Sequence, residues 1–240
     1  MKISVVVPAF NEEKLLAGSL ASIRAATKAF DDRGWSSELI VCDNNSTDRT
    51  AEIACAAGAQ VVFEPVNQIA RARNKGAEHA GGEWIFFVDA DSYPTAELFR
   101  DAAEAIRAGC LAGGATVALE DAPSAAALAV GFWNGLSRVT RWAAGSFIFC
   151  EARTFREAGG FSEELYASEE IDLFRRLKRI SRRERRRIVI LHRHPLRTSG
   201  RKLRLYGWGE LLHFMAKTVL SRGRTLKSRS DCFAWYDGRR

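Results

Sequence analysis

Two aspartates separated by one residue follow a short apolar run near the middle of the chain. Asp89 and Asp91 come directly after Trp84-Ile85-Phe86-Phe87-Val88, whose length and composition predict a buried strand. On an extended backbone their side chains project to the same side, where two carboxylates repel each other unless a cation lies between them. Such oxygen ligands suit Mg²⁺ or Mn²⁺, and phosphate oxygens commonly complete the coordination. The alternative is a polar turn in which one aspartate caps a helix after Pro94.

Polar and acidic residues also follow two earlier apolar runs. The run Ile3–Val7 predicts a strand that ends at Pro8-Ala9-Phe10-Asn11-Glu12-Glu13, and Glu38–Cys42 predicts one that ends at Asp43-Asn44-Asn45-Ser46-Thr47-Asp48. Ligands of open α/β sheets bind outside the carboxyl ends of the strands. These two loops and the aspartate pair therefore predict one acidic site at one sheet edge. The alternative is local structure only, with Asn11 and Asp48 as helix caps or turn residues.

Strand and helix signals alternate along the first 93 residues. Leu16, Leu20 and Ile23 recur at helical spacing after the first strand, and a second helix is expected to end at Gly58. A third strand is expected at 60–63 and a third helix at 69–80. This alternation predicts an α/β fold, with a doubly wound, mostly parallel sheet and helices on both faces. Further elements are expected at 94–108, 109–119, 125–142, 145–150, 153–158, 168 onward and 188–191.

Four segments resemble motifs of the family 2 glycosyltransferases of the GT-A fold. They are the loops at 8–13 and 43–48, the segment Asp89-Ala90-Asp91, and Arg71-Ala72-Arg73-Asn74-Lys75-Gly76-Ala77. Each motif is loose, but the four occur in the family's order and spacing, and the resemblance covers about residues 1–180. It implies a single GT-A domain over residues 1–200, with a nucleotide-binding half at 1–93 and an acceptor-side half at 94–200.

The resemblance also implies which residues bind the nucleoside. Under it, Pro8, Phe10 and Glu12 line the nucleoside pocket, and Asp43 hydrogen-bonds the base. Arg73 contacts the nucleotide from the other side. The alternative reading of Pro8 is an ordinary strand stop, and that of Asp43 is turn chemistry.

The metal and the diphosphate have candidate residues of their own under the resemblance. Asp91 binds a divalent cation, Mn²⁺ or Mg²⁺, that bridges the diphosphate, and Asp89 reaches the ribose or the same cation. In GT-A enzymes a histidine after the last core strand can complete the metal coordination; His192 or His194 could do so here, and His194 is the preferred candidate. The segment Ser199-Gly200-Arg201-Lys202 would bring positive charge to the diphosphate when a C-terminal loop closes.

An acidic helix start supplies the candidate catalytic base. In Ser168-Glu169-Glu170-Ile171-Asp172-Leu173, Ser168 is the expected N-cap. Helical spacing aligns Glu170 with an inward apolar stripe and Asp172 with surface arginines. The family pattern is roughly G-E-D-x-D-L, and its second acid is the base of inverting transfer, which makes Glu170 the base and Glu169 the second catalytic candidate. The alternative is that both glutamates only favour the helix dipole.

Positive charge is concentrated in the C-terminal third. The chain of 240 residues has a formal net charge of +7, and Lys and Arg crowd the sequence from about Arg175 onward. This asymmetry indicates an anionic partner. Residues 201–240 are expected to form a basic amphipathic extension, with a helix over Tyr206–Leu220, that contacts a membrane surface or forms a solvated tail. The region Ala125–Trp142 is expected to cover the core, to stack on a sugar or to lie at a lipid headgroup layer.

The sequence shows no pattern of a disulfide framework or of a spanning segment. Its five cysteines are scattered without a C-x-x-C pair. The apolar run at the N-terminus is too short for a signal peptide, and no run approaches about 18 apolar residues. We therefore expect a cytoplasmic protein, peripheral on the cytoplasmic membrane face if the extension binds lipid.

These observations converge on one function and leave two alternatives. We expect a metal-dependent glycosyltransferase that moves a sugar from a nucleotide sugar to an acceptor hydroxyl with inversion. A UDP-sugar is favoured as the donor, and a GDP-sugar stays open. The acceptor class stays open between lipid-linked, small-molecule and protein acceptors. A sugar nucleotidyltransferase is disfavoured because the loop at 8–13 has no glycine and carries two acids. A non-catalytic basic protein that binds nucleic acid is disfavoured because no nucleic-acid motif is present.

Overall fold

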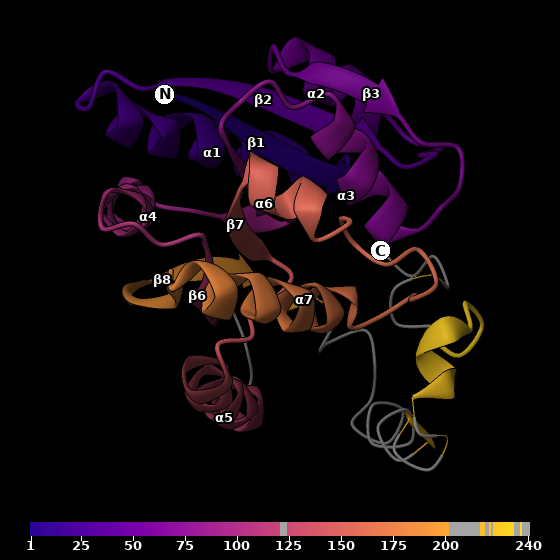
Figure 1. Cartoon of the computed structure of the whole chain (residues 1–240). Coiled ribbons are helices and arrows are strands. Elements are labelled where there is room, and N and C mark those ends of the chain that lie inside the picture. Colours follow the sequence, from indigo (N-terminus) through magenta and orange to yellow (C-terminus); the bar gives the residue numbers. More distant parts are fainter. Residues whose placement is uncertain (121–123, 202–216, 219–220, 222, 233–235, 237–240) are drawn as a thin grey trace.

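A mixed β-sheet runs through the centre of the molecule (Figure 1). The structure is a computed structural model of the chain, and it describes residues 1–120, 124–201, 217–218, 221, 223–232 and 236. Within these residues the sheet has eight strands in the order β3-β2-β1-β4-β7-β6-β8-β5. The strands are β1 (Lys2–Ala9), β2 (Ser36–Asp43), β3 (Gln60–Phe63), β4 (Trp84–Val88), β5 (Ser92–Tyr93), β6 (Ala112–Glu120), β7 (Phe147–Glu151) and β8 (Ile188–Ser199). The helices are α1 (Leu16–Asp31), α2 (Thr50–Ala56), α3 (Ile69–Glu78), α4 (Ala96–Arg107), α5 (Ser124–Thr140), α6 (Ala152–Glu157) and α7 (Glu169–Glu184), with a 3₁₀ turn at Arg224–Lys227.

The N-terminal half of the sheet is parallel, as expected. Strand β1 pairs in parallel with β2 on one side and with β4 on the other, and β2 pairs in parallel with β3. The chain order reverses at β1, so a crevice opens between the ends of β1 and its neighbours, where open α/β sheets bind ligands. Strand β7 is antiparallel to both β4 and β6, whereas β6 and β8 are parallel. The doubly wound, mostly parallel α/β fold is thereby confirmed, with β7 as an antiparallel insertion.

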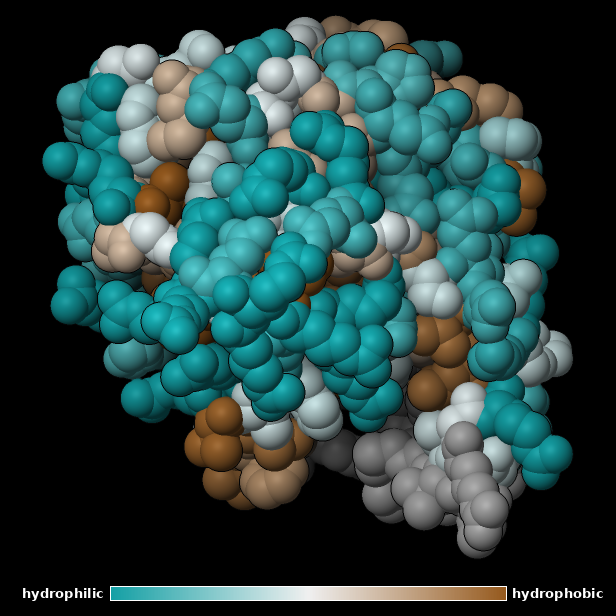
Figure 2. Space-filling view, in the orientation of Figure 1, coloured by the Kyte–Doolittle hydropathy of each residue, from teal (hydrophilic) through white to brown (hydrophobic). Residues whose placement is uncertain are grey.

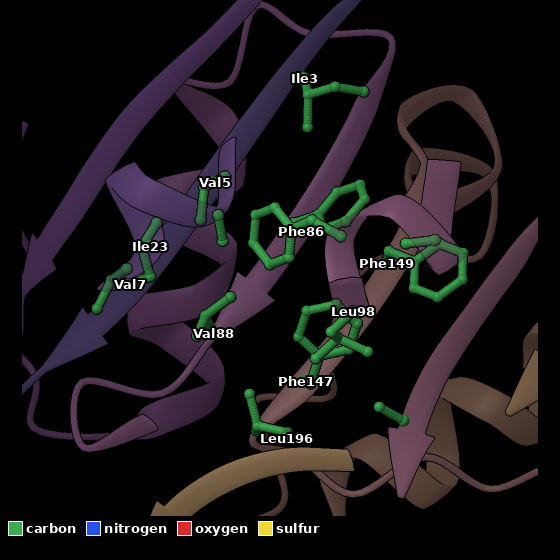
Figure 3. Packing of buried hydrophobic residues seen from close by; sticks show 14 of the residues in the cluster. Ile3, Val5, Val7, Ile23, Phe86, Val88, Leu98, Phe147, Phe149 and Leu196 are labelled. Carbon is green, nitrogen blue, oxygen red and sulfur yellow. The ribbon is translucent and has the colours of Figure 1, made fainter. Parts of the chain in front are cut away.

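Both faces of the sheet are covered, so the central strands are buried on both sides. One apolar cluster joins α1 and α4 to Val5, Phe86 and Phe149, and Figure 3 shows its side chains converging between strands and helices. The second cluster, on the opposite face, joins α3, α6 and α7 to Val6 and Phe87. Neighbouring residues of one strand thus face opposite layers. Each of the five residues of β4 is buried, which confirms the strand predicted before the aspartate pair.

Some local predictions were wrong. Neither Asp89 nor Asp91 caps α4, because the Thr95 side chain does so by accepting from the Leu98 N–H at 3.3 Å. Ser168 stands at the N-cap position of α7 but its side chain caps nothing, and its backbone is left-handed with φ of 63°. The expected strand at 188–191 continues to Ser199, since it pairs with β6 again at Leu196–Ser199 after a shift in register.

The expected extension is only partly described. Residues 219–220 and 206–216 of the predicted helix lie outside the described residues. The segment around the 3₁₀ turn packs on the loop before α7, where the Tyr166 N–H donates to the Leu226 carbonyl at 2.7 Å and Lys227 pairs with Glu164 at 2.6 Å. Part of the region 201–240 therefore lies against the domain.

Candidate active site

A pocket with an open volume of about 550 Å³ lies at the carboxyl ends of β1 and β4. Its lining comes from the loops after β1, β2 and β4, from the start of α3 and from the C-terminal segment. The lining residues are Pro8, Ala9, Phe10, Glu12, Asn44, Asn67, Ile69, Asp89, Ala90, Asp91 and Tyr236. The structure thus brings together Pro8, Phe10, Glu12, Asp89 and Asp91, which sequence reasoning had assigned to one site.

The loop after β1 is held in place by the loop after β2. The Asn11 side chain does not cap α1, because its Oδ1 accepts from the Thr47 N–H at 2.8 Å. The backbone N–H of Asn11 donates to Ser46 Oγ at 3.0 Å. The Glu12 N–H donates to Thr50 Oγ1 at 2.8 Å. Asp48 accepts from the backbone N–H groups of Glu13 and Thr50, which confirms its reading as a turn residue, whereas Arg49 stands at the N-cap position of α2. These bonds fix the backbone that presents Glu12 to the pocket.

Asp43 and Asn44 shape the pocket in different ways. Asp43 is buried and does not line the pocket; its Oδ1 accepts from the Ser46 N–H at 3.1 Å and stabilises the turn. Asn44 does line it, and its side chain donates to the Val66 carbonyl at 2.6 Å and accepts from the Gln68 N–H at 2.9 Å. Asn44 therefore positions the loop before α3. Base recognition by Asp43 stays a prediction.

A cation from the chain lies among the acids of the pocket. Arg201 donates from Nη2 to both carboxylate oxygens of Glu12, at 2.7 and 3.0 Å, and the same nitrogen is 3.9 Å from Asp91 Oδ2. Each of the three side chains is less than 15% exposed. The end of β8 is held here because the Ser199 N–H donates to the Asp91 carbonyl at 3.1 Å. Carboxylates that are so little exposed to water need a partner of opposite charge, and Arg201 is such a partner for Glu12 and Asp91.

Arg73 joins the aspartate pair to the acidic start of α7. Its guanidinium donates to Glu169 Oε1 at 2.6 Å, to Asp89 Oδ1 at 2.9 Å and to the Gly145 carbonyl at 2.9 Å. Burial alone would lower the pKa of Arg73, but the charges of Asp89 and Glu169 outweigh it and raise that pKa above its usual range. Arg73 is 1% exposed and outside the pocket lining, so nucleotide contact by it stays a prediction.

A close approach of α3 to the sheet sets the position of this arginine. A Cβ atom on Gly76 would lie 2.3 Å from Val6 Cγ1, so only glycine lets the helix pack at this distance. The glycine of the segment at 71–77 is therefore explained by the packing of α3 on β1.

The two glutamates of α7 have different surroundings. Glu169, held by Arg73, is buried, and Glu170 is half-buried at the head of the stripe that continues with the buried Leu173, Phe174 and Leu177. Burial and the neighbouring Glu169 carboxylate raise the pKa of Glu170 to about 8, against the opposing effect of Arg73. Asp172 pairs with Arg176 at 2.7 Å on the surface, as expected. The Glu170 carboxyl is therefore mostly protonated at neutral pH, and once ionised it is a stronger base than an ordinary glutamate.

His194 lies away from the aspartate pair. Its Nδ1 is 3.0 Å from Asp101 Oδ2 of α4, and it stands on β8 four residues before Thr198, which pairs with Ser92. That spacing along an extended strand is roughly 13 Å. We therefore leave His194 out of the candidate metal ligands. It lies within β8, which continues past the predicted end of the strand at residue 191.

The carboxylates of Asp89 and Asp91 suit a divalent cation whose coordination is completed by oxygens of a bound phosphate. In the described part of the chain, no cluster of three or more His, Cys, Asp or Glu side chains forms a metal site. Asp89 and Asp91 nevertheless place oxygen ligands in the pocket, and such ligands suit Mg²⁺ or Mn²⁺ with phosphate oxygens completing the coordination.

Sequence reasoning missed several lining residues. Asn44 lies in the motif at 43–48, but Asn67, Ile69 and Tyr236 lie in no sequence motif that indicates a ligand site. Tyr236 reaches the pocket from the C-terminal segment, where its hydroxyl accepts from the Ile69 N–H at 3.2 Å. Burial raises the pKa of this hydroxyl, so it stays protonated.

Comparison with known proteins places the chain in a family. The model of glycosyl transferase family 2 matches residues 4–147. A curated relative, an uncharacterized glycosyltransferase of Mycobacterium tuberculosis (strain ATCC 25618 / H37Rv), is 39% identical over 89 residues, which are 37% of this chain and 36% of the relative. The chain thus matches only about a third of that relative's length.

Solved structures share the fold. TarS of Staphylococcus aureus in complex with UDP-GlcNAc has a TM-score of 0.64 at 22% identity, over 84% of this chain and 59% of that one. The mannosyltransferase PcManGT of Pyrobaculum calidifontis, in complex with GDP-Man and Mn²⁺, has a TM-score of 0.66 at 18% identity, over 94% and 62%. The fold is the GT-A fold of these structures. Because the family match covers more than half of the sequence, the chain belongs to glycosyl transferase family 2.

Proposed function

We propose that this chain is a metal-dependent, inverting glycosyltransferase that uses a nucleotide sugar, a UDP-sugar in preference to a GDP-sugar. The observation that carries the proposal is that one pocket holds Pro8 and Phe10 beside Glu12, Asp89 and Asp91. Apolar and aromatic surface suits a nucleoside, and adjacent carboxylates suit a cation bound to a diphosphate.

The donor proposal has support from structures of similar fold. TarS was solved with UDP-GlcNAc, and PcManGT with GDP-Man and Mn²⁺. Both are less than 25% identical to this chain, so they support a nucleotide-sugar donor without deciding the base.

Asp91, with Asp89 beside it, would hold the divalent cation in the pocket. When bound, the cation would neutralise the charge that develops on the nucleoside diphosphate as it leaves. Arg201 adds a second positive charge at the same corner. Arg73 keeps Asp89 oriented through the hydrogen bond at 2.9 Å.

Glu170 would take the proton of the acceptor hydroxyl. Its raised pKa makes the ionised carboxylate a stronger base than an exposed glutamate. The acceptor oxygen then attacks the anomeric carbon in line with the bond to the diphosphate, so the new bond forms on the opposite face and the configuration inverts. Lipid-linked, small-molecule and protein acceptors all satisfy this chemistry.

The first test is calorimetric titration of UDP and GDP, each with and without Mn²⁺. We expect UDP binding that requires Mn²⁺ in the wild type and is lost in Asp91→Ala. Asp172→Ala is the matched control, because it removes an aspartate that pairs with Arg176 on the surface. Binding that survives in Asp91→Ala, or no binding of either nucleotide, would contradict the assignment of the pocket.

A second test addresses the stereochemistry. We expect the anomeric configuration of the product, read by NMR, to be opposite to that of the donor sugar. Retained configuration would overturn the role of Glu170 as a base while leaving the donor site intact.

A further inference from the structure

Helix α5 exposes a continuous apolar stripe. The exposed fractions are 78% for Leu128, 75% for Phe132, 36% for Leu136 and 84% for Val139. These positions are four, four and three residues apart, so they lie on one side of the helix. Figure 2 shows the hydrophobic patch at the lower edge of the molecule, where Figure 1 places α5. Patches of this kind on a soluble domain mark interaction surfaces.

The opposite side of α5 is anchored, so the stripe has a fixed orientation. The Asn134 side chain accepts from the Val117 N–H at 3.0 Å and donates to the Val117 carbonyl at 2.9 Å. Val130 and Trp133 pack against the apolar cluster that also contains α1 and α4. The side of α5 that carries Asn134, Val130 and Trp133 packs on β6 and the apolar cluster. The apolar side chains of the stripe, on the other side of the helix, therefore face outward.

A basic cluster adjoins the C-terminal end of this helix. Arg175 and Lys178 of α7 lie over the Trp142 ring, at 5.6 and 5.1 Å from its centroid, and Lys178 donates to the Thr140 carbonyl. Burial lowers the pKa of Lys178, and the like charges of Arg182, Arg141 and Arg175 act in the same direction. The basic cluster, as used below, is Arg141, Arg175, Lys178, Arg179 and Arg182.

The charge of the basic cluster is not balanced by ion pairs among the residues that the structure describes. None of its members forms an ion pair in the part of the chain that the structure describes. Other arginines of the same region do: Arg153 pairs with Glu184, Arg183 with Glu157, and Arg186 with Glu151. The unbalanced cations are thus gathered beside the apolar stripe, where an anionic partner would meet both.

We infer that the stripe of α5 and the basic cluster together form a docking surface for an anionic phospholipid bilayer. The apolar side chains would enter the boundary between headgroups and acyl chains, and the cations would contact the lipid phosphates. In the described part of the chain, no helix has the length and apolar character needed to cross a membrane, so the contact would be interfacial. A second copy of the chain is a poorer occupant, because it would bring two unbalanced basic clusters together.

Vesicle co-sedimentation of the full chain tests this inference. We expect binding to vesicles of phosphatidylglycerol and phosphatidylcholine in equal parts, and little binding to phosphatidylcholine alone. Salt at about 1 M, where the Debye length falls to about 3 Å, should weaken the binding. Failure to bind the anionic vesicles at low salt would overturn the inference, whatever the result of the nucleotide titration.

Two double variants, each with a control variant, locate the contact. Phe132→Ser/Val139→Ser should lower the partition coefficient by about tenfold or more, while Phe63→Ser, which removes a phenylalanine that is 54% exposed on β3, should not change it. Arg175→Gln/Arg182→Gln should also lower it, while Arg100→Gln/Arg107→Gln, on α4, should have a much smaller effect.

The remaining outcomes are decisive as well. Thermal unfolding verifies that each variant is folded. Wild-type binding by both double variants would place the lipid contact elsewhere and overturn the inference. A dimer in sedimentation velocity that dissociates in Phe132→Ser/Val139→Ser would also overturn it, because the stripe would then be an interface between copies of the chain.

Discussion

Arg201 and Glu12 are 189 positions apart in the sequence, yet one guanidinium nitrogen of Arg201 donates to both carboxylate oxygens of Glu12. The same nitrogen lies 3.9 Å from Asp91. A positive side chain of the protein thus lies beside the carboxylate that we assign to the metal. A divalent cation would meet this charge when it binds.

Removal of this charge should change metal and nucleotide binding in opposite directions. In Arg201→Gln, we expect the affinity of the nucleotide-free protein for Mn²⁺ to rise about threefold to tenfold. The reason is that the electrostatic repulsion between the guanidinium and the cation, about 1 kcal/mol, is lost. The affinity for UDP with Mn²⁺ should fall, since the diphosphate loses a positive partner. Titration of Mn²⁺ and of UDP measures both. Arg193→Gln, at an exposed position of β8, is the control. Unchanged affinities would show that Arg201 leaves the pocket on binding.

The pH dependence of the reaction should report Glu170. Because the pKa of Glu170 is about 8, the carboxyl is mostly protonated at neutral pH and kcat/KM should rise with pH through about 8. In Glu169→Gln, the charge that helps to raise this pKa is gone, so the midpoint should move to lower pH. A profile of kcat/KM against pH for both proteins tests this. Asp172→Asn should keep the wild-type midpoint; a midpoint unchanged in Glu169→Gln would contradict the coupling.

The same carboxyl should make the fold less stable in alkaline solution. Glu170 has a pKa of about 8 in the folded chain against 4.5 as its ordinary value, so the unfolded chain releases this proton first. Its contribution to the free energy of unfolding is complete below about pH 4.5 and is lost as the pH rises through about 8. We therefore expect Glu170→Gln to raise Tm relative to the wild type at pH 9 but much less at pH 5. An equal change at both values would mean that the titration is not the cause.

Arg73 should be far more important for stability than its neighbour Arg71. In Arg73→Met, Glu169 and Asp89 lose their shared cation in a buried setting, which should cost about 3–5 kcal/mol of the free energy of unfolding. Arg71→Met breaks pairs with Glu64 and Glu163 at a side chain that is 35% exposed, which should cost about 1 kcal/mol or less. Urea denaturation measures both. Similar losses in the two variants would contradict the special role of Arg73.

The parts of the site that sequence reasoning found are local in the chain. A strand and the loop that follows it are neighbours in sequence, so parallel pairing of β1, β2 and β4 carries the loops at 8–13, 43–48 and 89–91 to one edge. The same logic misjudged His194, because continued pairing with β6 extended β8 beyond the predicted loop.

The parts that it missed depend on contacts between distant segments. The hydrogen bonds of Arg73 to Glu169 and Asp89 require α3 to pack against β1 at Gly76, a distance that no local pattern encodes. The Tyr236 hydroxyl is held at the pocket by the backbone N–H of Ile69 in α3, and Tyr236 belongs to no recognisable motif. Such side chains are found only when the tertiary structure is known.

The position of β7 has a consequence for the order in which a growing chain can mature. Strand β4 pairs with β1, 81 residues earlier, but its other edge stays open until Phe147–Glu151 has been synthesised. Until then the phenylalanines of β4 border an unpaired strand edge. Chaperones bind surfaces of this kind, and aggregation can start from them. Arg201 emerges from the ribosome later still. A nascent chain would therefore complete its first parallel sheet well before it could assemble the acidic corner of Glu12, Asp91 and Arg201.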